Sequence, residues 1–391
     1  MKIAFLGGIA MRGFEDTMNR EAAKPILAPI QAVLKQADIR IANWENPTTV
    51  ELSPIEKSGP ALHSKPQNIG FLQEAGVELA VLANNHGGDH GPEGALESMR
   101  HLADAGIASV GAGKDLESAC KPQILEHNGE TVAVFAVREH EFGFAAEARA
   151  GTAPYDHIRL ARDIRKIRPK ADFVVAVMHC GNEYCPIPSP LAMERYRDLA
   201  DCGADAVIGM HPHCMQGYEE YHGAQIVYST GNFFFGYPSH AERALGWNHG
   251  YVPIVELQKG KPTGMEIFPY QFPKDCSRIV PFEGENKKAI MDYIDRLNEP
   301  IHSPELHKFL YDGWCSHVGD MYAMGLGNFK AEYRTGTTDQ RLYDLSNLLS
   351  CEAHHELLNN YLRNLMEHRW EAVKAGIEPV LELSRLPVSM F

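Results

Sequence analysis

The chain has 391 residues, of which 44% are hydrophobic and 23% charged, and its formal net charge is −14. This length and composition are typical of a globular protein with a large core, and the length favours two structural units over one. The excess of acidic residues argues against nonspecific binding to nucleic acid or anionic membrane. It does not exclude binding of a small anionic ligand, because a bound divalent cation can reverse the local potential.

The N-terminal sequence MKIAFLGGIAMRGFED begins like a signal peptide. Its apolar run is short, is interrupted by glycines and is followed by charged residues, so we interpret it as a first buried strand. No stretch approaches the ~20 apolar residues that a membrane helix requires. The eight cysteines include no CxxC pair, and a chain of this length does not need disulfides. We therefore expect reduced thiols, a cytoplasmic location and no contact with a membrane.

Up to about residue 282, short apolar runs alternate with amphipathic helical patterns. The apolar runs predict strands over residues 2–6, 38–43, 78–83, 131–137, 172–178 and 205–208, and helical spacing predicts helices over 92–104 and 190–201. This alternation is typical of an α/β sheet. Hairpin signals at Asn128-Gly129, at His222-Gly223 and at residues 260–262 indicate an antiparallel part as well. A mixed sheet, or two packed sheets, fits both patterns.

The pattern changes from about Gly284 onward, where strand signals become few. Helices are predicted over residues 288–297 and 304–322 and, in pieces, over 340–383. We interpret residues 1–283 as one α/β domain and residues 284–391 as a helical extension packed on it. His354 and His355 lie on one of these helices, where surface or interdomain contacts are the main interpretation and metal binding the lesser one.

Polar side chains follow the predicted strands at their carboxyl ends, which is where ligands bind in open α/β sheets. Asn43 and Glu45 follow the second strand and are hard oxygen donors, although a polar turn explains them equally well. Asn85 and His86 follow the third strand. An amide oxygen can bind a metal there while the imidazole serves as a proton donor, with Asp89 fixing its tautomer. Asp89 as a helix N-cap is the structural alternative.

Two later strands end in histidines. His179 follows the very apolar run FVVAVM, and a single histidine at such a place is more often structural than functional. His211 and His213 follow the strand at 205–208, and the alternation of side chains along an extended chain places both imidazoles on one side. Both can then reach metal ions a few ångströms apart. Taken together, the strand-end signals indicate a metal site.

Other loops of the same kind give weaker signals. Asn232 follows a short strand and is expected to orient a ligand or close the site, whereas the three phenylalanines after it are expected in the core. Glu141 either adds an acidic wall to the site or simply begins a loop. The side chains that we expect to contact a substrate are Arg12, Asn43, Glu141, Glu183 and Asn232.

At these residues the chain resembles the CapA family of poly-γ-glutamate capsule synthesis proteins, a branch of the calcineurin-like metallophosphoesterases. The resemblance covers about residues 3–255, and its most specific stretches are LANNHGGDHG and GADAVIGMHPHCMQGYEEYHGAQIVYSTGNFFF. The helical tail, with its run LLSCEAHHELL, resembles an extension found in one subgroup. The resemblance implies a four-layer αββα sandwich with a site for one or two divalent metals at the strand ends.

Matched residue by residue, the resemblance assigns a role to each motif residue. Glu45 corresponds to the acidic residue that bridges two metals, and Asn85 to the ligand of the Asn-His motif. His86 corresponds to the imidazole that faces the phosphate. From its position beside His86, and not from the resemblance, we expect Asp89 to be the second catalytic residue. His179, His211 and His213 correspond to the remaining metal ligands.

The chain departs from the family pattern at two positions. The family has Gly-Asp after the first strand, and that Asp would be a metal ligand, but here the pair is Gly7-Gly8. Met210 stands where a histidine is usual. We therefore expect one well-formed metal position, made by Glu45, Asn85, His179 and His211, and a second that is weakened or absent. Ordinary two-metal hydrolysis depends on both ions.

Two functions follow from this site. The first is a hydrolase that uses Mn, Fe, Zn or Mg and acts on a phosphoester or on a small or peptide-like anionic substrate related to poly-γ-glutamate. The second is a non-catalytic accessory protein that binds such a polymer. A TIM-barrel metal hydrolase also uses His-x-His, but there the pair follows the first strand, whereas here it follows more than 200 residues.

Overall fold

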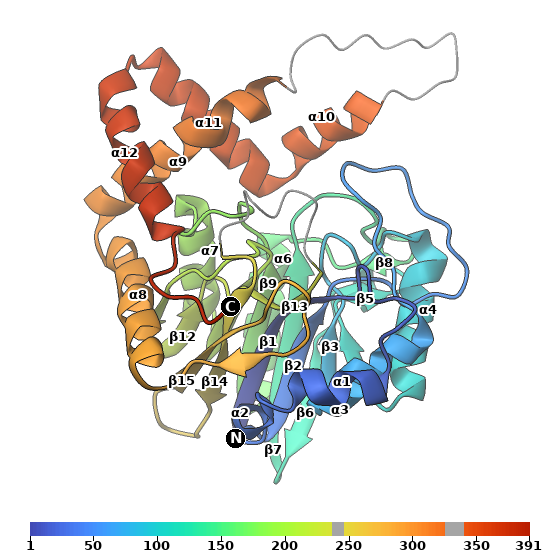
Figure 1. Cartoon of the computed structure of the whole chain (residues 1–391). Helices are drawn as coiled ribbons and strands as arrows, with labels where there is room; N and C mark the ends of the chain where they lie inside the picture. The colour runs from blue at the N-terminus through green and yellow to red at the C-terminus, as the bar shows by residue number, and fades with distance from the viewer. Residues whose placement is uncertain (237–245, 325–339) are drawn as a thin grey trace, which may run out of the picture.

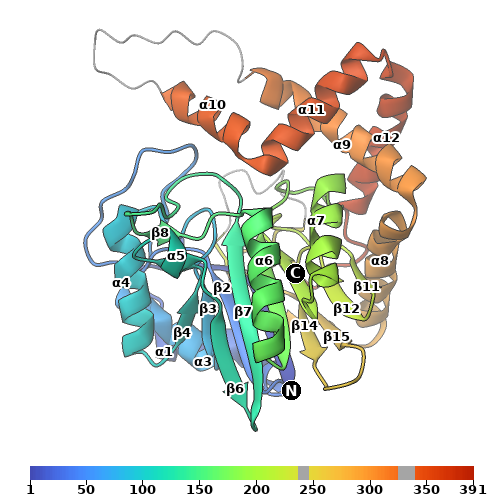
Figure 2. The same cartoon turned by 180° about the vertical axis from the view of Figure 1, so that it is seen from behind.

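The computed structural model describes residues 1–236, 246–324 and 340–391. Two β-sheets lie face to face, and helices cover the outer face of each (Figure 1, Figure 2). Side chains of both sheets, such as Phe5 and Ile41 of one and Phe135 and Val175 of the other, belong to one buried apolar cluster. The α/β sandwich predicted from the sequence is confirmed.

The first sheet has the strand order β16-β15-β14-β1-β2-β3-β4, and β13 also pairs with β1. Its strands are β1 (Lys2–Ala10), β2 (Ile39–Trp44), β3 (Leu79–Val81), β4 (Ala108–Val110), β13 (Asn232–Phe235), β14 (His249–Glu256), β15 (Gly264–Gln271) and β16 (Val280–Pro281). The second sheet has the order β11-β12-β10-β9-β7-β6. Its strands are β6 (Gln123–His127), β7 (Glu130–Arg138), β9 (Phe173–His179), β10 (Ala206–Met210), β11 (Tyr218–Tyr221) and β12 (Ala224–Val227). A small separate ladder joins β5 (Ala112–Gly113) to β8 (Gly151–Thr152).

Both sheets are mixed, as the sequence predicts. The β1-β2-β3-β4 and β7-β9-β10-β12 ladders are parallel. The expected hairpins form between β6 and β7, β11 and β12, and β14 and β15. Asn128 and Gly129 have φ of 52° and 79°, the left-handed conformation that a tight hairpin needs. The parallel strands of both sheets end at one common edge (Figure 1), where the polar loops gather.

Helices in the first part of the chain lie outside the sheets. They are α1 (Arg20–Leu27), α2 (Gln31–Leu34), α3 (Gly70–Ala75), α4 (Gly91–Asp104), α5 (Leu116–Ala119), α6 (His157–Ile167) and α7 (Pro190–Asp201), with short 3₁₀ turns at Pro66–Ile69 and Arg168–Lys170. The α7 helix begins where the sequence predicts, because Ser189 caps the Ala192 amide and Pro190 occupies the first helical position.

The C-terminal helices are α8 (Gly284–His302), α9 (Pro304–Met324), α10 (Gln340–Ser350), α11 (Glu352–Met366) and α12 (Trp370–Leu383). The α8 helix inserts Ile290, Ile294 and Leu297 into the core of the sandwich. The α9 helix and the later helices form a further buried cluster, which includes Leu310 and Leu357 and also takes in Cys185 and Ile187 from the loop after β9. The domain limit at residue 283 stays a prediction, and by packing α8 belongs with the sandwich.

The later helices lie above the edge where the parallel strands end (Figure 1). Glu352 accepts hydrogen bonds from the backbone and ring of His140 at 2.9 and 2.8 Å, and Asn182 donates to the Ala353 carbonyl at 3.0 Å. On the other side, Gln340 donates to the Lys57 carbonyl at 2.8 Å. The helices therefore hold the loops that follow the strands. His354 is half-buried in this contact and His355 is exposed, in agreement with their main interpretation.

Within the described ranges, no helix is both long and apolar enough to cross a membrane.

One buried histidine makes the stability of the sandwich sensitive to acid. His249 begins β14, is 4% exposed and, among the described residues, has no hydrogen-bond partner for either ring nitrogen. Burial lowers its pKa to about 3. Because the unfolded chain takes up this proton below a pKa of about 6.5 and the folded chain does not, stability falls as the pH drops from about 6.5 towards 3.

We expect His249→Phe to remove this sensitivity while keeping the ring stacked on Phe282. Between pH 7.5 and pH 5 the parent protein should lose about 2 kcal/mol more unfolding free energy than the variant. Urea unfolding of both proteins at the two pH values measures the difference, and parallel losses would contradict the assignment.

Candidate metal centre

Strands of both sheets bring two overlapping groups of potential metal ligands together. One group is Glu45, His179 and His211, and the other is Glu183, His211 and His213; in each, one ligand atom per residue lies within 4.8 Å of the others. Glu45 directly follows β2, His179 is the last residue of β9, and His211 directly follows β10. The sandwich therefore joins side chains that are up to 168 residues apart in sequence, counted from 45 to 213.

Glu45 lies between the histidines and is fully buried. Its Oε2 accepts a hydrogen bond from Asn43 Nδ2 at 2.9 Å. Its Oε1 has no hydrogen-bond partner among the residues that the structure describes, and it lies 3.9 Å from His179 Nε2 and 3.7 Å from His213 Nε2. Burial, followed by the charge of Glu183, raises the pKa of Glu45 well above its ordinary value. A buried carboxylate oxygen without a partner is costly, and a bound cation would remove that cost.

The three histidines are poised as ligands. Burial lowers the pKa of His179 well below its ordinary value, lowers that of His211 to about 3, and lowers that of His213. The imidazoles are therefore neutral near pH 7, which is the form that binds metals. His179 Nε2 lies 3.0 Å from Asn85 Oδ1, and within the described part of the chain the buried His211 Nδ1 has no hydrogen-bond partner. These residues fit a divalent cation.

Asn232 fixes the orientation of the His213 ring through its Nδ1 atom. Asn232 Nδ2 donates to the Trp247 carbonyl at 3.0 Å, which turns its Oδ1 towards His213 Nδ1 at 2.9 Å. His213 therefore carries its proton on Nδ1 and keeps Nε2 free on the side of Glu45. Both polar atoms of Asn232 are engaged and its side chain is buried, so its place favours this orienting role over the substrate contact expected from the sequence.

The backbone at the site adopts unusual conformations. His211 has φ of 103°, His213 of 57° and Tyr184 of 64°, in a region that side chains other than glycine rarely occupy. Such strain persists only where the surroundings impose it, and it concentrates at functional sites. The strain here supports the assignment of this edge as the site of the chemistry.

His86 is held by a buried ion pair next to the histidine cluster. Its Nδ1 lies 2.7 Å from Asp89 Oδ2, and Lys57 Nζ lies 2.6 Å from Asp89 Oδ1. Burial acts to raise the pKa of Asp89, but the neighbouring His86 and Lys57 outweigh it and hold the pKa below its ordinary value. The charged Asp89 fixes the His86 tautomer with the proton on Nδ1. His90, not Asp89, occupies the N-cap position of α4, so the capping alternative is wrong.

Gly8 provides the space that Glu45 fills. A Cβ atom at this position would lie 2.8 Å from Glu45 Oε2 and 3.0 Å from Asn232 Oδ1. At Gly7, a Cβ atom would lie 2.0 Å from the Gly231 carbonyl oxygen, because β13 passes very close to β1. The absence of an aspartate side chain at position 8 therefore leaves no empty space, because the Glu45 carboxylate occupies the volume beside Gly8.

The remaining predicted residues lie at different depths around the cluster. Asn43 is buried and holds Glu45, whereas Glu141 and Glu183 are half-buried at its rim. Arg12 lies in the turn after β1, and no hydrogen bond between described residues joins its side chain to the cluster. The sequence did not indicate Lys57, because it lies in a polar loop 32 residues before Asp89 and no local pattern sets it apart.

A family model described as "Bacterial capsule synthesis protein PGA_cap" matches residues 2–237. The chain belongs to this family. It is 30% identical over 299 residues to the PGA biosynthesis protein CapA of Bacillus subtilis, covering 74% of this chain and 77% of that protein. It is 29% identical over 283 residues to the capsule biosynthesis protein CapA of Bacillus anthracis, covering 67% and 69%.

Among solved structures, the 5'-nucleotidase precursor of Thermus thermophilus is similar with a TM-score of 0.44 and 11% identity, covering 78% of this chain and 59% of that one.

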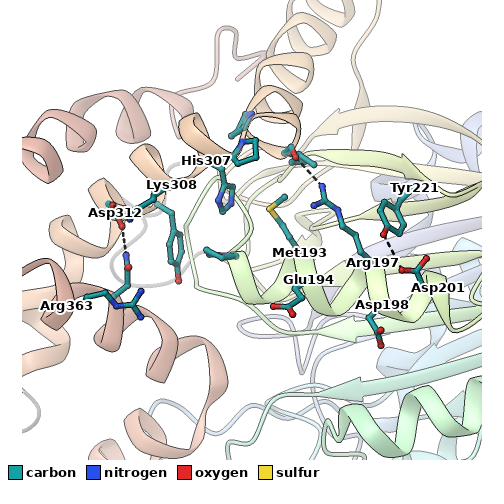
Figure 3. A pocket seen from close by; sticks show the side chains of 16 residues that line it. Met193, Glu194, Arg197, Asp198, Asp201, Tyr221, His307, Lys308, Asp312 and Arg363 are labelled. Atoms are coloured by element: carbon teal, nitrogen blue, oxygen red, sulfur yellow. Dashed lines mark hydrogen bonds and ion pairs between the residues drawn. The ribbon is translucent and has the colours of Figure 1, made fainter.

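A cavity of about 670 Å³ lies away from this site, between α7, α9 and α11 (Figure 3). It shares no residue with the histidine cluster. Several of its charged side chains are paired within the protein. Arg197 binds Glu219 at 2.8 Å, and Lys308 binds Asp312 at 2.8 Å. Since the groups of potential metal ligands gather at the histidine cluster, we place the chemistry there and not in this cavity.

We expect Lys57→Met to destabilise the fold by about 3–5 kcal/mol, because it leaves the buried Asp89 carboxylate without its cation. Lys121→Met is the matched control, since Lys121 pairs with Glu117 on the surface and its loss should change stability little. Urea unfolding at pH 7 measures both variants, and equal effects would contradict the role given to the buried pair.

Proposed function

We propose that the protein is a divalent-metal-dependent hydrolase. The observation that carries this proposal is the buried Glu45 Oε1. It has no hydrogen-bond partner in residues 1–236, 246–324 and 340–391, and it lies between the ring nitrogens of two neutral histidines. A structural role alone would leave this carboxylate oxygen unsatisfied at a cost in stability. A cation held by Glu45, Asn85, His179 and His211 would remove this cost.

A divalent cation bound there would lower the pKa of a coordinated water and polarise the bond to be broken. The protein's own residues supply the rest. Asn43 holds the Glu45 carboxylate through Oε2, and Asn232 keeps the His213 Nε2 atom free. Both contacts fix ligand orientation before any ion arrives, which is what a preorganised centre requires.

His86 is proposed as the proton donor to the leaving group. With its Nδ1 proton committed to Asp89, the Nε2 atom is the one available for proton transfer. Its charge also contributes to lowering the pKa of His179, His211 and His213, so it lies close to the ligand cluster. Lys57 helps to keep Asp89 ionised, and Asp89 holds the His86 ring through Nδ1.

The proposed substrate is a phosphoester or a small peptide-like anion related to poly-γ-glutamate. The second choice comes from the names of the relatives, since the Bacillus subtilis protein is named for PGA biosynthesis. Contact with nucleic acid or membrane is not expected for a chain of net charge −14. The eight cysteines are free, and the cytoplasmic location stays a prediction.

We expect the Mn²⁺-loaded protein to hydrolyse bis(4-nitrophenyl) phosphate, and a chelator to abolish this activity. His211→Ala should lose both bound metal and turnover. His86→Gln should keep its metal while kcat falls by roughly 10²–10⁴-fold, the usual contribution of a general acid. His355→Gln, at an exposed histidine, is the control. Metal analysis and release of nitrophenolate measure the result, and an inactive protein with full metal content would overturn the proposal for this substrate class.

A second candidate function is an accessory protein that binds the polymer without cleaving it. Two relatives in Mycobacterium tuberculosis that are 26% identical are named as probable polyglutamine synthesis accessory proteins. Gly8 supports this candidate as well, because it stands where the family pattern has an aspartate that would bind a metal, and ordinary two-metal hydrolysis depends on both ions. Binding needs only one cation to neutralise an anionic chain.

If this candidate is correct, oligo-γ-glutamate should bind in a metal-dependent manner without any new amino groups appearing over hours. Calorimetry and a ninhydrin assay measure binding and cleavage separately. His211→Ala should abolish binding, and oligo-α-glutamate of equal length is the matched control ligand. Cleavage of the γ-linked oligomer would exclude this candidate.

A further inference from the structure

We propose that a cavity on the outer face of the second sheet, separate from the metal centre, binds an organic phosphate of the size of a nucleoside diphosphate. The cavity has a volume of about 330 Å³ and is formed by α5, α6 and the segments next to them. Figure 2 shows α6 on the outer face of this sheet. The cavity shares no residue with the groups of potential metal ligands, so the inference goes beyond the proposed function and does not depend on it.

The α6 helix and the 3₁₀ turn that follows it are strongly basic in an otherwise acidic chain. Residues 157–170 contain six Lys or Arg residues and one acidic residue, whereas the net charge of the whole chain is −14. The apolar face of the helix packs Leu160 and Ile164 into the core. The cations of this segment that line the cavity are Arg159, Arg162, Lys166 and Lys170. They are three or four residues apart, and this spacing places them on one face.

Three cations in the cavity have no countercharge from the protein. Five cationic and two acidic side chains line it, and each acidic side chain already has a partner. Lys121 Nζ lies 3.1 Å from the Glu117 carboxylate. Arg162 Nε lies 3.0 Å from the Asp163 carboxylate. Within the described residues, the lining side chains without a hydrogen bond or an ion pair to the protein include Arg159, Lys166 and Lys170. These three charges are available to an anion.

Beside these charges the cavity has an apolar surface. The side chains that form it are Cys120, Pro122, Phe135 of β7 and Ile167 of α6. Burial raises the pKa of the Cys120 thiol, so this side chain is neutral near pH 7 and adds to the apolar surface. Apolar walls with a few charged groups are typical of small-molecule sites, and the volume of this cavity lies within their usual range of roughly 300–1,000 Å³.

The arrangement of the charges favours phosphate as the anionic group. A phosphate ester concentrates almost two negative charges on three oxygens, and both Arg and Lys bind such groups. Three free cations along one helix face therefore match two linked phosphates better than a single carboxylate. Nucleic acid or an anionic membrane would also meet the acidic surface around the helix, which repels them. A soluble phosphate ester with an apolar or aromatic body matches both the cations and the apolar surface.

Binding of ADP to the metal-free full chain tests this inference. Calorimetry is carried out after a chelator has removed divalent cations, so that no metal ion can hold the phosphates at the histidine cluster. We expect one ADP per chain, weaker binding of pyrophosphate, which lacks the apolar body, and no binding of adenosine, which lacks the charge. His211→Ala should bind ADP as tightly as the parent protein. Absence of ADP binding, equal affinity for ADP and pyrophosphate, or binding of adenosine would overturn the inference.

Substitutions on α6 and the turn after it locate the site. Lys166→Gln and Lys170→Gln should each weaken ADP binding by about 10-fold or more, because each removes a charge-assisted hydrogen bond to phosphate. Arg165→Gln is the matched control, since Arg165 is an exposed cation on the same helix that does not line the cavity. It should keep the parent affinity, and thermal unfolding shows that all three variants are folded. Equal losses in the three variants would indicate general attraction to a basic helix and would overturn the inference, whereas loss of hydrolysis at the metal centre would leave it standing.

Discussion

A carboxylate that is buried away from water must be stabilised by positive charge or by hydrogen bonds. In Glu45, only one of the two carboxylate oxygens has such a partner among the described residues. Asn43 satisfies Oε2, whereas Oε1 faces the imidazoles of His179 and His213. Burial favours the neutral form of each imidazole, so the histidines cannot supply the missing charge near pH 7. The neighbouring features follow from this constraint: the glycine that leaves room for Glu45, the asparagine that orients His213, and the strained backbone at His211.

The two-sheet architecture is what makes such a site possible. Each sheet presents the carboxyl ends of its parallel strands to the same edge, so that Glu45 from β2 meets His179 from β9 across the sandwich core. The C-terminal helices then hold the loops above that edge, through Glu352 with His140 and Gln340 with the Lys57 carbonyl. Restricting water at the edge strengthens every charge interaction within it. The helical extension therefore acts on the centre through loop position, and none of its described residues belongs to the ligand groups.

The sequence by itself determined the strands, the hairpins and the candidate ligands, because these depend on local patterns. Alternation of apolar runs with helical spacing located β1, β2, β3, β7, β9 and β10, and Asn128-Gly129 located a hairpin through its left-handed preference. Glu45, Asn85 and the histidines were found because polar residues at strand ends stand out from buried strands.

Only the tertiary structure decided how these residues share the site. Pairing of β13 with β1 brings Asn232 level with Gly8, and nothing within either segment specifies that register. The same holds for Lys57 against Asp89 and for Glu183 against His213. These contacts join segments that are distant in sequence or lie on opposite sheets, so their geometry depends on how the two sheets and the helical extension pack together and on no local pattern.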